Sequence, residues 1–162
     1  MASGRKQNAG ARKSDACNCG ALRKATRRIS QLYDAALAPS GIKVTQRGIL
    51  VEVGRSGPTT VGELAEALVM DSGALAHTLK PLERDGLVDI TVDPADRRSR
   101  LITLTRQGRA KLAETDALWE KAQQGFEVAF GRTDSESLRE ALRFLTSEGF
   151  SAAFDKTLSR SR

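Results

Sequence analysis

The feature of this sequence that most limits its fold is one change in the spacing of its apolar residues. Val88, Ile90 and Val92 alternate with polar residues, the chain turns at 93–96, and an apolar run at 101–104 follows. An alternating run and a second apolar run, joined by a turn, predict a β-hairpin. Before and after it, apolar residues recur at intervals of three and four, the spacing of amphipathic helices. We therefore expect a mainly α-helical protein with one small β-hairpin (α+β), and not an all-β sandwich.

Signals for helix starts divide the part before the hairpin into four helices. Thr60 and Glu63 form a capping-box pattern, in which a hydroxyl and a carboxylate satisfy free N–H groups at a helix start. Asp71 is a candidate cap for the next helix, and Thr45 for the one before. The expected helices cover about 22–38, 45–55, 60–68 and 71–85.

Two long helices are expected after the hairpin. Leu112, Leu118 and Phe126 belong to an apolar stripe over about 105–130, and a second stripe runs over about 135–158. A helix over the first range would be ~39 Å long, more than a small domain needs. The first helix and these two carry more apolar surface than one core can bury. Residues 17–40 and 105–158 are therefore expected to form the helical dimerisation region of a homodimer.

The two short helices and the hairpin, within residues 41–104, match a winged helix-turn-helix, whose second short helix enters the major groove of DNA. On a helical wheel, the face of this helix opposite Leu75, Leu79 and Leu82 is polar and cationic. Any amphipathic surface helix can carry Lys and Arg there, and a lone histidine is as readily a bystander as a base contact; the neighbouring hairpin favours DNA. The candidate DNA-binding residues on and beside this face are Ser72, Gly73, Ala74, His77, Lys80 and Arg84.

The tip of the hairpin concentrates arginines. Arg97, Arg98 and Arg100 follow one another closely, and residues 97–111 hold six basic and no acidic side chains. Arginine reaches phosphates with a forked geometry and enters narrow minor grooves. A charge run is more often only solvated, but beside a helix-turn-helix it predicts a DNA contact. Asp96 is expected to hold one of these arginines in an ion pair.

Composition excludes several other classes of protein. One His and two Cys are too few ligands for a structural zinc site, and no nucleophile motif is present. We therefore expect no metal, no cofactor and no enzymatic activity. No segment is apolar enough for a signal peptide or a membrane helix, so a cytoplasmic protein with no membrane partner is expected. The net charge of +6 is concentrated at the ends, where residues 1–16 are predicted to be a flexible basic arm and 159–162 a basic tail.

Several short runs resemble the MarR family of transcriptional regulators. They are Gly62–Ala65, Met70–Ser72, Leu79–Leu87, Asp93–Arg98 and Leu104–Gly108, and the most specific part is an Asp-Arg-Arg hairpin followed by Leu-Thr-x-x-Gly. The resemblance covers about residues 17–158. It implies a homodimeric, triangular winged-helix protein with terminal helices as the dimer interface. It also implies a ligand pocket between that interface and the DNA-binding lobe.

The two cysteines allow two interpretations. The organic-hydroperoxide-sensing branch of this family has a reactive cysteine at the start of the first helix, fourteen residues before a tyrosine; Cys19 and Tyr33 stand in that relation. The other two tyrosines of that branch correspond to Arg23 and Val44 here. A sulfenic acid at Cys19 could be trapped as a disulfide by Cys17 or by a thiol of the second subunit. The alternative is an unreactive free thiol at a helix start.

Together these features predict a sequence-specific DNA-binding transcriptional regulator. A two-fold symmetric dimer requires a near-palindromic operator with half-sites ~34–36 Å apart. We expect a repressor that a small-molecule effector or an oxidant releases by favouring the conformation that does not bind DNA. The alternative is a nonspecific architectural DNA-binding protein, which uses its basic tails and hairpin and has a uniform affinity across sequences.

Overall fold

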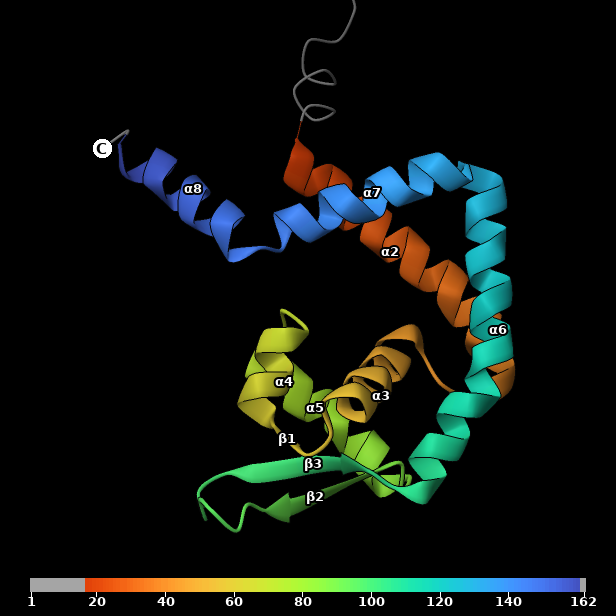
Figure 1. The fold of residues 1–162 in the computed structure, drawn as a ribbon. Coiled ribbons are helices and arrows are strands. Elements are labelled where there is room, and N and C mark those ends of the chain that lie inside the picture. The colour runs from red at the N-terminus through yellow and green to blue at the C-terminus, as the bar shows by residue number, and fades with distance from the viewer. Residues whose placement is uncertain (1–16, 161–162) are drawn as a thin grey trace, which may run out of the picture.

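A small antiparallel sheet lies at one end of the molecule (Figure 1). The computed structural model describes residues 17–160. The hairpin prediction is confirmed, with Ile90 opposite Ile102, and a third, two-residue strand pairs with the other edge of the hairpin. That strand is too short to show alternation, so it is not predicted from sequence. The strands are β1 (Thr59–Thr60), β2 (Val88–Val92) and β3 (Arg100–Leu104), in the order β1-β3-β2.

Three helices pack against this sheet and form one core with it. They are α3 (Val44–Ser56), α4 (Val61–Ala67) and α5 (Ser72–Arg84). The predicted positions Leu75, Leu79 and Leu82 face inward and are fully buried. We call residues 42–104, which contain this core, the winged lobe.

Two of the three predicted caps start the short helices. Thr60 Oγ1 accepts the N–H of Glu63 at 3.2 Å, and Glu63 Oε2 accepts the N–H of Thr60 at 2.8 Å. Both the N–H and the hydroxyl of Thr60 donate to Glu63, so the pKa of this carboxyl lies below its usual value. Asp71 Oδ1 accepts the N–H of Ala74 at 3.0 Å and starts α5.

The third predicted cap, Thr45, is wrong. Lys43 is the N-cap of α3, and Thr45 lies inside the helix. Asp34, in the preceding helix, accepts the N–H of Val44 at 2.7 Å. The carboxylate of Asp34, ten residues before Val44, thus supplies the acceptor that we expected from the hydroxyl of Thr45.

The other helices form a helical frame beside the winged lobe (Figure 1). α2 packs along α6, and α8 extends away from the rest of the described chain. No helix in residues 17–160 is long and apolar enough to cross a membrane. The frame consists of α2 (Asn18–Leu37), η1 (Ala38–Ser40), α6 (Arg106–Phe130), α7 (Arg132–Leu145) and α8 (Glu148–Ser159).

The predicted single helix over 135–158 is wrong in extent. It is two helices, and the first begins at Arg132, directly after Gly131 with its positive φ of 95°. The break comes at Thr146–Ser147, because Ser147 Oγ accepts the N–H of Phe150 at 3.2 Å and caps α8. The predicted arm at 1–16, and the last two residues of the tail predicted at 159–162, lie outside the described residues.

The Leu-Thr-x-x-Gly run joins the hairpin to α6. Thr105 Oγ1 donates to the carbonyl of Gly86 at 2.7 Å and accepts the N–H of Gly108 at 2.9 Å. A Cβ on Gly108 would lie 2.0 Å from the carbonyl oxygen of Leu87. The backbone of α6 therefore approaches the hairpin more closely than any residue with a side chain allows.

One buried arginine joins the winged lobe to the frame. Arg47 of α3 donates from Nε to Thr115 Oγ1 at 3.1 Å and from Nη2 to Asp116 Oδ1 at 2.9 Å. Its guanidinium carbon lies 4.3 Å from the ring centroid of Trp119, a cation–π contact. We call Arg47 with these three α6 residues the Arg47 cluster. Since all three partners belong to α6, the cluster holds α3 against that helix.

Candidate nucleic-acid interface

The outer face of α5 carries six of the predicted DNA-binding residues, and all six are exposed. Because Leu75, Leu79 and Leu82 anchor α5 in the core, the opposite face is left to solvent. Near its start, a Cβ on Gly73 would come within 3.0 Å of Asp71 Oδ1, so the capping carboxylate sits close over this glycine. The six are Ser72, Gly73, Ala74, His77, Lys80 and Arg84.

A groove of about 730 Å³ separates α5 from the start of α3. Lys43 and Thr45 line its α3 side, and His77, Lys80 and Arg84 line its α5 side, with no acidic residue in the lining. Sequence reasoning missed Lys43 as part of this surface, because its place next to α5 depends on how the two helices pack. A basic residue just before a predicted helix start was the only available signal.

The predicted arginines at the wing are exposed at the hairpin tip. Arg97, Arg98 and Arg100 have no ion pair among the described residues. The predicted ion pair with Asp96 is therefore wrong: Asp96 Oδ1 instead accepts the backbone N–H of Arg98 at 3.0 Å. This local bond shapes the turn and leaves the guanidinium groups unneutralised.

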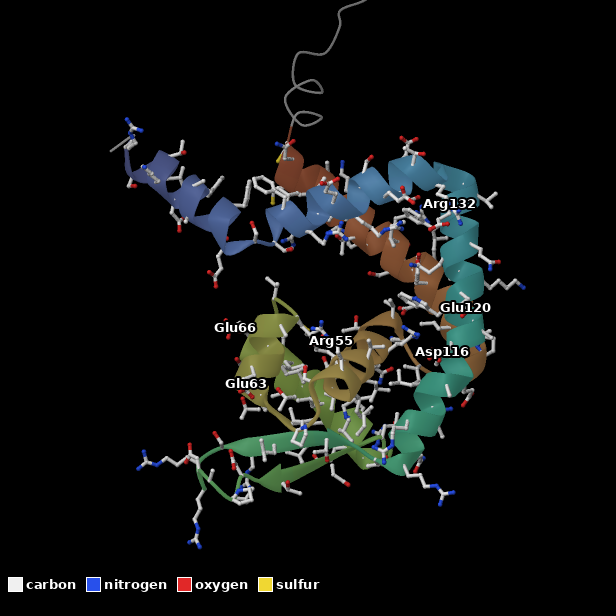
Figure 2. The ribbon with its side chains drawn as sticks, viewed as in Figure 1. Arg55, Glu63, Glu66, Asp116, Glu120 and Arg132 are labelled. Atoms are coloured by element: carbon white, nitrogen blue, oxygen red, sulfur yellow. The ribbon has the colours of Figure 1, made fainter. Side chains whose placement is uncertain are left out.

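The acidic side chains next to this surface make local contacts: Asp71 caps α5, Asp96 accepts a backbone N–H in the hairpin turn, and Asp85 pairs with Arg84. Arg84 is the one predicted α5 cation that is paired, with Nε 2.9 Å from Asp85 Oδ1. Figure 2 shows Glu63 and Glu66 projecting from α4, not from α5 or the hairpin. The wing and α5 therefore present a cationic surface.

The cysteines lie at the start of α2 and are exposed. Cys17 is the N-cap, and its Sγ accepts the N–H of Gly20 at 3.3 Å. Cys19 lines an apolar cavity of about 690 Å³ between α2 and the α7–α8 turn, with Leu22 and Phe154 among the other lining residues. The two cysteines are thus two residues apart, with Cys17 at the helix end and Cys19 at an apolar wall.

Tyr33 is not brought to the cysteines within one chain. Fourteen residues along a straight helix correspond to ~21 Å. The Tyr33 hydroxyl donates to Gln123 Oε1 of α6, and its ring packs edge-on against Trp119 at 5.0 Å between centroids. Burial raises the pKa of Tyr33, so the phenol stays protonated as the donor to Gln123. A contact between Tyr33 and Cys19 would require a second copy of the chain.

Two short helices joined by a turn, with an arginine-tipped hairpin packed beside them, define a winged helix-turn-helix protein. The chain belongs to the MarR family: the family model described as "MarR family" matches residues 40–99. The helices and three-stranded sheet agree with solved regulators of this family.

Three relatives illustrate the similarity. The Mycobacterium tuberculosis transcriptional regulator MOSR, solved in complex with DNA, is 32% identical with a TM-score of 0.75, and the match covers 84% of this chain and 98% of that one. The transcriptional activatory protein BadR of Rhodopseudomonas palustris is 35% identical over 46% of this chain and 44% of BadR. The organic hydroperoxide resistance transcriptional regulator of Bacillus subtilis is 32% identical over 56% of this chain and 61% of that protein. The matches to the two curated relatives thus span less than two thirds of their lengths.

Proposed function

We propose that this chain is a sequence-specific, dimeric DNA-binding regulator of transcription. The observation that carries the proposal is the cationic surface formed by α5 and the wing, with all nine predicted residues exposed. Lys80 and Arg84 stand on the face of a helix that can enter a major groove, and Arg97 stands at the hairpin tip, where it reaches the flanking backbone or minor groove. The DNA complex of MOSR supports this use of the fold.

Exposed apolar side chains on the frame support dimerisation. None of the residues of α8 is buried. Its apolar residues Phe154 and Leu158 are more than half exposed. Phe150 stacks on Phe154 and meets Phe144 edge-on, so the aromatic row continues from α7 into α8. We propose that a second copy covers this row and part of α2, which makes residues 17–40 and 105–158 the dimerisation region and 41–104 the DNA-binding lobe.

Selection of bound duplexes from random DNA tests the proposal. The expected result is a near-palindrome whose half-sites lie ~34–36 Å apart, because two α5 helices related by a two-fold axis read the same sequence in opposite directions. Recovery of no common sequence, together with equal affinity for unrelated duplexes, would establish the nonspecific architectural alternative instead.

The proposed effect of operator binding is repression. A dimer on a promoter excludes other proteins from the same DNA, and an effector relieves this by binding the other conformation better. A reporter gene with the selected palindrome inside its promoter tests the sign. We expect lower expression of the reporter gene in the presence of the protein. Higher expression would instead make the chain an activator, which is the role that the name of BadR gives to that relative.

We also propose an organic hydroperoxide as one effector. The Cys19 thiolate attacks the peroxide, the O–O bond breaks, and the products are a sulfenic acid and an alcohol. Cys17 then displaces water from the sulfenic acid and a disulfide forms. The position of Cys19 at an apolar wall, two residues after Cys17 at the helix end, supports this proposal.

Cumene hydroperoxide at one equivalent per chain tests the redox proposal. The wild type should dissociate from its operator and bind again after dithiothreitol has reduced the disulfide, whereas Cys19→Ser should stay bound. Cys17→Ser should be released but accumulate a mass increase of one oxygen. If the peroxide released Cys19→Ser from the operator as readily as the wild type, neither cysteine would take part in the response.

A further inference from the structure

The first half of α2 carries a cluster of cations outside the surface formed by α5 and the wing. The cluster consists of Arg23, Lys24, Arg27 and Arg28, which are all exposed, and we call it the α2 basic stripe. With ~100° of rotation per residue, its members lie ~80–220° around the helix axis from the buried Tyr33. The apolar Leu22 and Ile29 lie within ~40° of Tyr33. Because Tyr33 packs against α6, the stripe belongs to the side of α2 that faces away from that helix.

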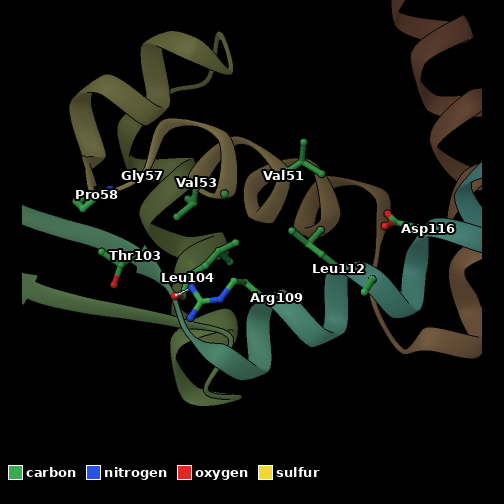
Figure 3. Close-up of a pocket in the computed structure, with 11 residues that line it drawn as sticks. Val51, Val53, Gly57, Pro58, Thr103, Leu104, Arg109, Leu112 and Asp116 are labelled. Atoms are coloured by element: carbon green, nitrogen blue, oxygen red, sulfur yellow. Dashed lines mark hydrogen bonds between the residues drawn. The ribbon is translucent and has the colours of Figure 1, made fainter.

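No described carboxylate neutralises the α2 basic stripe. None of its four residues has an ion pair among the described residues. The single acidic residue of α2, Asp34, accepts the N–H at the start of α3 at 2.7 Å. By contrast, Arg139 lies 3.6 Å from Glu127 Oε1, and Figure 3 shows Arg109 donating to the carbonyl of Leu104 at 2.8 Å. Within the described chain, the stripe is therefore left open to an outside anion.

The spacing of the stripe lowers the stability of α2. Arg23 lies four residues before Arg27, so the two cations face each other on neighbouring turns. Lys24 and Arg28 are related in the same way. Pairs of like charge at this spacing destabilise a helix. Bound negative charge relieves the repulsion, so the stripe is better suited to a polyanion than to water alone.

The sequence concentrates positive charge around this stripe. Residues 1–28 hold eight basic and one acidic side chain, so they carry +7, whereas the remaining residues carry −1. The stripe supplies four of the eight basic side chains. The other four belong to residues 1–16, which lie outside the described residues. A ligand of high negative charge is the kind of partner that this distribution attracts most strongly.

The charge density of the stripe is close to that of duplex DNA. Its four cations occupy ~7.5 Å along the helix axis, which is about one charge per 2 Å. Duplex DNA carries one negative charge per ~1.7 Å of its axis. The same side of α2 also holds Gly20, Gln31 and Ala35. It therefore offers no aromatic ring for an unpaired RNA base and no large apolar residue for the core of a protein interface.

The α2 basic stripe lies far from the proposed operator surface. Figure 1 shows the first half of α2 at the end of the molecule opposite the hairpin. Helix α6, with 25 residues and a length of ~37 Å, runs from the hairpin to that end. A duplex held by α5 and the wing therefore leaves the stripe free.

We propose that the α2 basic stripe binds the phosphate backbone of a second DNA segment, without sequence preference. The protein then bridges two duplexes, one held by α5 and the wing and one held by α2. This second site goes beyond the proposed function, and binding at the stripe does not depend on it.

Fluorescence cross-correlation tests the bridge. Full-length protein is mixed, at about 50 mM salt, with a red-labelled duplex that carries the selected palindrome and a green-labelled duplex of unrelated sequence. The two colours should diffuse together. The affinity for the green duplex should fall with salt with a logarithmic slope of about −3.6, the value for four phosphate contacts. Absence of joint diffusion while the red duplex binds would overturn the proposal and leave the operator function intact.

A double variant locates the second duplex. Arg27→Gln combined with Arg28→Gln should bind the green duplex at least about tenfold more weakly, with a slope smaller by about 1.8, and should bind the red duplex like the wild type. Lys121→Gln combined with Lys156→Gln removes two exposed cations from α6 and α8 and is the control, which should bridge like the wild type. Equal bridging by the wild type and both double variants would mean that the winged lobes hold both duplexes, and would overturn the proposal.

Competition identifies the class of partner. Unlabelled duplex DNA should displace the green duplex at a lower charge concentration than poly(U) or polyglutamate does. Stronger displacement by poly(U) would identify RNA as the partner, and stronger displacement by polyglutamate an acidic protein; either result would overturn the assignment to DNA. If the protein bound no palindrome but held the green duplex through Arg27 and Arg28, the proposed function would fail and the stripe would stand.

Sedimentation and thermal melting exclude a role of the stripe within the protein itself. The variant with Arg27→Gln and Arg28→Gln should have the same oligomeric state as the wild type and at least the same melting temperature, because it loses only repulsive contacts. A change to monomer would make the stripe a contact between two copies of the chain. A lower melting temperature would give the two arginines a structural role. Either outcome would overturn the proposal.

Discussion

Arg97, at the tip of the wing, is the most direct test of the DNA surface. Arg97→Ala should weaken binding to the selected duplex by about 1–3 kcal/mol, because it removes a guanidinium that is placed to contact DNA. The substitution breaks no ion pair within the protein, since Asp96 bonds the backbone of Arg98. Electrophoretic mobility shifts at several salt concentrations measure this. Arg132→Ala, at the corner of α6 and α7 far from the wing (Figure 2), is the matched control and should have no effect. Equal affinities for Arg97→Ala and the control would remove the wing from the interface.

Gly108 is required by the close approach of α6 to the hairpin. In Gly108→Ala the new Cβ would meet the Leu87 carbonyl at 2.0 Å, so two backbones must separate. We expect a loss of about 3 kcal/mol in the free energy of unfolding, the upper end of the usual cost of overpacking. Urea denaturation followed by circular dichroism gives this value.

Gly48 provides the control for that substitution. It lies inside α3, and a Cβ there would meet nothing within 4 Å. Gly48→Ala should therefore raise stability by up to about 1 kcal/mol, the difference in helix propensity. If both alanines changed stability alike, the steric reason given for Gly108 would be wrong.

Val69, in the turn between α4 and α5, has a φ of 51° although it is β-branched. A left-handed conformation costs an L-residue roughly 1–2 kcal/mol, whereas glycine adopts it freely at an entropic cost of roughly 0.5–1 kcal/mol. Since Val69 is 72% exposed, Val69→Gly sacrifices little burial. The variant should be more stable by about 0.5 kcal/mol in thermal melts. A lower melting temperature would show that the exposed side chain contributes more than its conformation costs.

At the scale of elements, the capping box of α4 makes the helix-turn-helix sensitive to acid. The pKa of Glu63 is lowered in the folded chain because the N–H and hydroxyl of Thr60 donate to it. Its contribution to stability is therefore fully present above the ordinary value near 4.3 and is lost as the pH falls through the lowered folded value. Urea midpoints of the wild type and Glu63→Gln should differ at pH 6, and the difference should shrink as the pH falls below the ordinary pKa of a glutamate. A constant difference would mean that the charge of Glu63 plays no part.

Elements with local signals were predictable, and those defined by packing were not. The alternation at 88–92 and the cap at Asp71 act within a few residues, so they can be recognised without the fold. The start of α3 could not be placed, because Asp34 satisfies it from another helix. The break before α8 did have a local signal, the hydroxyl of Ser147, which the continuing apolar stripe obscured.

The candidate site divides in the same way. A helical wheel identifies the outer face of α5 because the buried leucines set its orientation. Lys43 joins the groove, and Arg47 reaches Asp116, only after α3 has packed against other helices. Arg47 and Asp116 are 69 positions apart, so no local sequence pattern predicts their contact.

For the whole molecule, we expect a dimer that depends on α8. Phe154 is 55% exposed in the single chain, so Phe154→Glu leaves the folded chain intact but places a charge in the proposed interface. Sedimentation at micromolar concentration should show a dimer for the wild type and a 17.5 kDa monomer for the variant. Lys156→Glu, ~200° around the helix from Phe154, is the control and should remain dimeric. A monomeric wild type would contradict the dimer and the half-site spacing with it.

The helical frame is assembled from both ends of the chain, and this has a consequence during synthesis. The winged lobe is one continuous segment, whereas α2 must wait for α6 before Tyr33 and Trp119 can meet. At ~5–20 residues per second, the ribosome makes Trp119 roughly 4–17 s after Tyr33. A nascent chain is therefore expected to contain the proposed DNA-binding lobe before α2 and α6 have packed together and before it can form the proposed dimer. The proposed dimer is therefore expected to occupy its operator only after α6, α7 and α8 have been made and two chains have paired.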